Sequence, residues 1–119
     1  MNDPFEILAE CRRVREENPA EALEILDELA DVPLEEMDDF DLLYDIAESF
    51  HELGGKSSGE YLTLCRERIE TDEEAAKVLT AVVCWEKDLP DAFRLLNETV
   101  NTYGYTVPVA EAVLEFARE

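Results

Sequence analysis

Lysine and arginine are absent from the long segment between Arg15 and Lys56. The whole chain of 119 residues has ten basic residues against 31 acidic ones, which gives a formal net charge of −21. Nucleic acids and anionic membrane surfaces are bound through clusters of lysine and arginine. We therefore expect neither nucleic acid nor a membrane as a ligand.

Cysteine is scarce, and Cys11, Cys65 and Cys84 are separated by 54 and 19 residues. An odd number at this spacing fits neither a disulfide framework nor a zinc site, so reduced thiols are expected. The N-terminal residues lack the basic and apolar regions of a secretion signal. No apolar run approaches the roughly 18 residues of a membrane span. These absences predict a soluble, cytoplasmic protein.

Groups suited to catalysis are also few. His51 is the only histidine, and no serine or cysteine has a local pattern that would pair with it as a nucleophile. The segment 54–59, GGKSSG, superficially matches a phosphate loop. Phe50 stands where that loop needs its first glycine, and a helix rather than a strand precedes it. We expect no enzymatic activity and no cofactor.

A metal site is not expected either. Asp38, Asp39 and Asp41 lie close together, but a calcium loop also needs alternating oxygen ligands, a central glycine and a closing glutamate. A solvated acidic face is therefore favoured over weak binding of a divalent ion. The basic cluster Arg12–Arg15 favours internal ion pairs with the acidic second helix, with an anion site as the alternative.

The chain is rich in acidic residues. Residues 16–50 contain fourteen acidic residues: Glu16, Glu17, Glu21, Glu24, Asp27, Glu28, Asp31, Glu35, Glu36, Asp38, Asp39, Asp41, Asp45 and Glu48. Such a block is usually disordered. Here Phe40, Leu43, Ala47 and Phe50 follow helical spacing through it. We therefore expect folded helices that carry their acids outward.

Helix start and stop signals recur every 15 to 20 residues. Ser57–Glu60 and Thr71–Glu74 have the pattern of capping boxes, and Gly54–Gly55 and Gly104 are typical helix ends. Leu79 lies in the most apolar segment, which predicts a central helix. The chain is predicted to be all-α, with antiparallel hairpins and no strand. Seven helices are expected, near 3–16, 19–31, 39–53, 58–70, 72–87, 90–103 and 108–118.

The helices also pair in a repeating way. Small residues near the starts of the second helices, at Ala22, Ser58–Gly59 and Ala92, are spaced by about 37 and 33 residues. The middle unit has residues of the expected type at the characteristic positions of a known repeat family, namely Leu43, Ile46, Ala47, Phe50 and Gly54. The chain resembles the tetratricopeptide repeat (TPR) family, whose unit is a helix–turn–helix of about 34 residues. A non-repeating bundle of six or seven helices is the alternative.

The resemblance implies one domain over 1–119, with units 3–34, 39–70 and 72–103 and a closing helix at 108–118. Proteins of the TPR family generally bind peptides or partner helices in a groove lined by the first helix of each unit. The groove residues implied here are Asp41, Tyr44, Glu48, His51, Lys77 and Trp85. Because this groove is acidic, we expect a protein or peptide partner with a basic or amphipathic segment.

Two other interpretations of the acidity stay open. The chain could mimic nucleic acid, or act as an immunity or inhibitor protein that neutralises a basic protein. Alternatively, the acidity serves only solubility at high salt, since three lysines stand against seven arginines.

Overall fold

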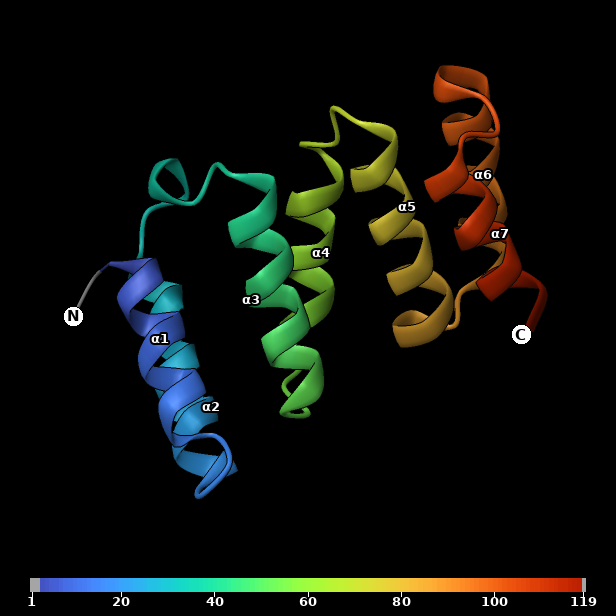
Figure 1. Ribbon diagram of the computed structural model, residues 1–119. Coiled ribbons are helices and arrows are strands. Elements are labelled where there is room, and N and C mark those ends of the chain that lie inside the picture. The colour runs from blue at the N-terminus through green and yellow to red at the C-terminus, as the bar shows by residue number, and fades with distance from the viewer. Residues whose placement is uncertain (1–2, 119) are drawn as a thin grey trace. The chain divides into compact units, whose positions relative to one another are not determined.

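The computed structural model describes residues 3–118, and over that range it contains helices and no strand (Figure 1). The predicted all-α class is therefore confirmed. The chain divides into two compact units, unit 1 up to Arg68 and unit 2 from Ile69 onward. The single domain expected from the sequence stays a prediction.

Unit 1 consists of two packed helical hairpins, α1–α2 and α3–α4. Its elements are α1 (Pro4–Val14), α2 (Pro19–Asp27), the 3-10 helices η1 (Glu28–Asp31) and η2 (Leu34–Glu36), α3 (Phe40–Glu52) and α4 (Ser58–Arg66). Its core is apolar and fully buried, as Ile7, Leu26, Leu29, Leu43 and Ile46 show. Short connections and an apolar face on each helix make the antiparallel hairpin the favoured arrangement.

Side-chain caps fix where most of these helices begin. Asp3 accepts a hydrogen bond from the Phe5 amide at 2.9 Å, and Asn18 accepts one from the Glu21 amide at 3.1 Å. The capping box predicted at Ser57–Glu60 is wrong, because the Ser57 side chain makes no capping hydrogen bond. Ser57 has φ −84° and ψ −2°, whereas a capping side chain needs an extended backbone.

The second predicted helix ends earlier than its apolar pattern suggested. The α-helix stops at Asp27, the chain tightens into η1, and Val32 is already extended at φ −88° and ψ 128°. Pro33 explains the ending, because a proline disfavours helical geometry in the residue before it. η2, which follows it, was not predicted.

The turn between α3 and α4 approaches α2 closely. Gly54 has a positive φ of 77°, which glycine adopts without strain. A Cβ on Gly55 would lie 2.7 Å from Cδ1 of Phe50 and 3.0 Å from Cδ1 of Leu23. Glycine at this position therefore lets the turn lie against side chains from both hairpins.

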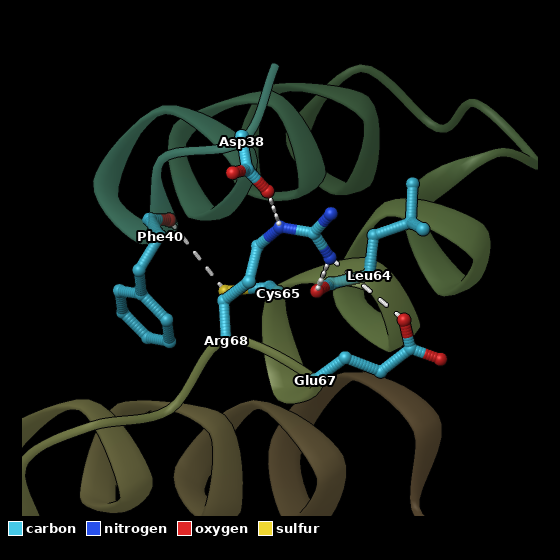
Figure 2. A network of polar contacts seen from close by, with 6 residues as sticks. All are labelled: Asp38, Phe40, Leu64, Cys65, Glu67 and Arg68. Atoms are coloured by element: carbon cyan, nitrogen blue, oxygen red, sulfur yellow. Dashed lines mark hydrogen bonds and ion pairs between the residues drawn. The ribbon is translucent and has the colours of Figure 1, made fainter. Parts of the chain in front are cut away.

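Polar contacts tie the end of α4 back to the start of α3 (Figure 2). Arg68 Nε donates to Asp38 Oδ1 at 2.6 Å, and its Nη1 donates to the backbone carbonyl of Leu64 at 3.1 Å. The buried thiol of Cys65 donates to the backbone carbonyl of Phe40 at 3.6 Å. The α3–α4 hairpin is thus held at the end opposite its glycine turn.

In unit 2, the central helix packs against the two that follow it. The elements are α5 (Asp72–Ala81), the π-helical turn η3 (Val82–Glu86), α6 (Leu89–Tyr103) and α7 (Val107–Arg118). The predicted capping box of Thr71 and Glu74 is confirmed, with both hydrogen bonds present. Leu79 is fully buried, so this apolar helix is central within its unit. The helix predicted to residue 87 is confirmed as far as Glu86, although its last turn widens from α-helical to π-helical geometry in η3, and Lys87 is left-handed at φ 55°.

Candidate functional site

The acidic charge is concentrated in unit 1. Unit 1 has twenty acidic and six basic residues, a net charge of −14, whereas unit 2 has eleven and four, a net charge of −7. Of the fourteen acids between 16 and 50, only Asp45 and Glu48 are half-buried and the others are exposed. The apolar residues between them fill the core. The acids therefore cover an ordered helical surface rather than a disordered segment.

Four acids form a stripe along α3, which we call the α3 stripe: Asp41, Asp45, Glu48 and Glu52. They recur every three or four residues and so lie on one face of the helix over three turns. A row of carboxylates this close raises the local negative potential and attracts cations. The stripe includes two of the predicted partner-binding residues, Asp41 and Glu48.

Arg12 of α1 and Arg15, which caps the end of that helix, neutralise half of the stripe. Arg12 forms an ion pair with Asp45, with 3.4 Å between Nη2 and Oδ2, and Arg15 forms one with Glu52. The expected pairing with the second helix is therefore wrong for these two residues. α1 packs on α2 as a hairpin with its buried residues apolar, and Arg12 and Arg15 reach across to α3. Exposed pairs like these are worth about 0–1 kcal/mol each.

The other half of the stripe keeps its charge. Within residues 3–118, neither Asp41 nor Glu48 forms an ion pair. Tyr44 lies between them along the helix, half-buried, and its ring stacks on Phe40 at a centroid distance of 6.2 Å. His51 follows on the next turn and is exposed. Two carboxylates on either side of an anchored aromatic ring can bind a cationic segment.

The remaining predicted site residues belong to unit 2. Lys77 is exposed on α5, and Trp85 is half-buried in the π-helical turn η3. The α3 stripe belongs to unit 1, so a groove that these residues share with it stays a prediction.

Two of the three acids that came closest to a metal pattern have structural roles, and the third is exposed. Asp38 pairs with Arg68, and Asp39 caps α3 by accepting from the Leu42 amide at 3.3 Å. Asp41 is exposed on the stripe. Across residues 3–118, no three His, Cys, Asp or Glu side chains gather in a way that could hold a metal ion. In the same range, every helix is too short or too polar to cross a membrane.

Unit 1 also contains a cleft that sequence analysis missed. Its volume is about 380 Å³, and it lies between the end of α2 with η1 and the α3–α4 hairpin. Apolar and aromatic side chains make its floor: Leu29, Val32, Met37, Phe50, Tyr61 and Leu64. Asp27 and Glu60, both exposed, stand at its edge. The residues come from four elements, so no local motif could have indicated the cleft.

Tyr61 lines the cleft, and its ring is stacked on Phe50 at a centroid distance of 5.5 Å. Burial raises the pKa of the Tyr61 phenol above its usual value of 10.0, and the charges of Glu60 and Asp27 raise it further. Because the pKa of Tyr61 depends on these two carboxylates, their negative charges act inside the cleft.

This raised pKa predicts a loss of stability in alkali. In the unfolded chain the Tyr61 phenol ionises near pH 10, whereas in the folded protein it keeps its proton to a higher pH. The contribution of Tyr61 to the free energy of unfolding is therefore complete below about pH 10 and declines above it. In Tyr61→Phe, the free energy of unfolding should therefore fall less than in the wild type between about pH 8 and about pH 11. Denaturant titrations across this range measure the difference, with Tyr105→Phe at an exposed site as the matched control. Identical curves for the wild type and Tyr61→Phe would contradict the assignment.

Comparisons with known proteins add no relative: no family model, no curated protein and no solved structure matches this chain.

Proposed function

We propose that this chain is a non-enzymatic interaction module that binds a basic or amphipathic segment of a partner protein through the acidic surface of its helices. The α3 stripe is the proposed contact, with Asp41, Tyr44, Glu48 and His51 as its binding residues. The register we propose is TPR-like, and it assigns Lys77 and Trp85 to the same set of partner-binding positions. The site of action is the cytoplasm, where thiols such as Cys11, Cys65 and Cys84 stay reduced.

The observation that carries the proposal is the charge left on the α3 stripe. α1 and its C-cap residue supply one arginine each to the stripe, and each arginine binds one carboxylate. Asp41 and Glu48, which alternate with those pairs, have no cation within the described residues. A partner segment with lysine or arginine at helical spacing can therefore complete the pattern that α1 begins. Such complementarity gives specificity and fast association.

Reversing the two unpaired charges tests this proposal. A helix-forming peptide of lysine and alanine with one central phenylalanine, about 18 residues long, serves as the probe. We expect the wild type to bind the labelled peptide and Asp41→Lys/Glu48→Lys to bind it at least about tenfold more weakly. Asp41 is exposed, so its substitution should change stability by only about 0.5 kcal/mol, and reversing the half-buried Glu48 breaks no ion pair among the described residues, so the variant should stay folded. Fluorescence anisotropy at low and physiological salt measures the affinity, and circular dichroism checks the fold.

Net charge is controlled with Glu98→Lys/Glu111→Lys, which changes two exposed acids of unit 2 by the same amount. Equal losses in both variants would mean that total charge attracts the peptide and the stripe is not a site. That result would favour an acidity that serves solubility at high salt.

A further inference from the structure

The cleft of unit 1 combines an apolar floor with an acidic edge. Its floor is apolar, with Leu29, Met37 and Phe50 each at most 3% exposed. Its edge carries a carboxylate on each of two elements, Asp27 at the end of α2 and Glu60 in the first turn of α4. No lysine or arginine is among the described residues that line it. An apolar group with positive charge on both sides matches this surface.

The size of the cleft limits its occupant. Sites for whole small molecules range from about 300 to 1,000 Å³, and 380 Å³ is near the lower end. That space suits one or two large side chains. Helices that dock on protein surfaces place single apolar anchors in such depressions and let their polar residues bind at the edge.

The cleft is separate from the α3 stripe. Phe50 lies nine residues after Asp41, which is about half a turn around the axis of α3. The stripe and the cleft thus use opposite sides of the same helix.

We propose that this cleft is a second docking site, which holds one large apolar side chain of a cationic amphipathic helix while the lysines or arginines on either side of it bind Asp27 and Glu60. The class of partner rests on the proposed function, but the site does not. Phe50 and Tyr61 form a stacked, buried pair beneath the floor, which gives the cleft a rigid base for an aromatic or aliphatic anchor. The carboxylates then select an anchor that has cations on both sides.

Filling the cleft without changing its charge tests the apolar contact. Ala30 is exposed and lines the cleft, so the indole in Ala30→Trp should occupy the space. With the lysine–alanine peptide that carries one phenylalanine, we expect Ala30→Trp to bind about tenfold or more weakly than the wild type. Ala20→Trp is the matched control, because Ala20 is exposed on α2 and does not line the cleft. It should bind like the wild type.

Neutralising the edge tests the charges. Asp27→Asn/Glu60→Gln should weaken binding of the same peptide about tenfold. In addition, a twin peptide with alanine in place of phenylalanine should bind the wild type more weakly than the parent peptide. Isothermal titration calorimetry gives all of these affinities.

The outcomes separate the two proposals. If Ala30→Trp and Asp27→Asn/Glu60→Gln bind like the wild type while Asp41→Lys/Glu48→Lys does not, the cleft is no docking site and the proposed function stands. If both peptides bind the wild type equally, the apolar anchor is refuted. If the wild type binds neither peptide, both proposals fail.

Discussion

Replacing Leu79 by alanine should lower the free energy of unfolding of unit 2 by about 2–5 kcal/mol. Leu79 is fully buried in α5, the helix that packs against both α6 and α7. Truncation removes buried apolar surface and leaves a cavity that the neighbouring helices fill only in part. Denaturant titration measures the loss, and Trp85 gives a local signal because it is the only tryptophan and follows α5 directly.

The matched control is Leu114→Ala in α7. Leu114 is 62% exposed, so the same truncation should change the stability by only about 0.5 kcal/mol. A loss below about 1 kcal/mol for Leu79→Ala would contradict the central position of α5 in its unit.

The second large effect is expected in unit 1, where Gly55→Ala should lower the free energy of unfolding by about 1–3 kcal/mol. The added Cβ would lie 2.7 Å from the ring of Phe50, which is buried and stacked on Tyr61. The ring has little room to move, so the strain spreads to the turn or to Leu23 on α2. Circular dichroism during denaturant titration measures the loss of stability.

A double-mutant cycle identifies the cause. If the clash with Phe50 is responsible, Gly55→Ala/Phe50→Leu should cost less than the two single changes added together. Additive costs would place the strain elsewhere. Gly54→Ala is the neighbouring comparison, because no atom lies within 4 Å of its added Cβ and only the positive φ is strained. If Gly55→Ala also shifts the Trp85 transition, the two units unfold together, as the single domain predicted from the sequence requires.

Local chemistry made the helices predictable. An acidic or amide side chain before a proline, as at Asp3 and Asn18, accepts a hydrogen bond from an unpaired backbone amide in the first turn of the helix. This bond does not depend on the rest of the fold. Glycine at 54 and 104 ends a helix because it adopts a positive φ without strain. The failures were local too: Ser57 has the right side chain, but its backbone is helical rather than extended. A sequence pattern names the capping group and does not fix its φ and ψ.

The candidate site was predictable only as one stripe on one helix. Asp41, Tyr44 and Glu48 share a face of α3 because spacing alone determines which residues of a helix lie together. Spacing could not show that Asp45 and Glu52 are neutralised, since Arg12 and Arg15 lie more than 30 residues earlier in the chain.

By itself, the sequence determined the helical class, most helix boundaries and the acidic character of the surface, because each depends on neighbours along the chain. Tertiary structure decided which acids keep their charge and where an apolar cleft opens. The cleft depends on Asp27, Phe50 and Glu60, which are brought together by packing of the two hairpins. Ion pairs and clefts are properties of distance in space, and helical periodicity sets such distances only within a single helix.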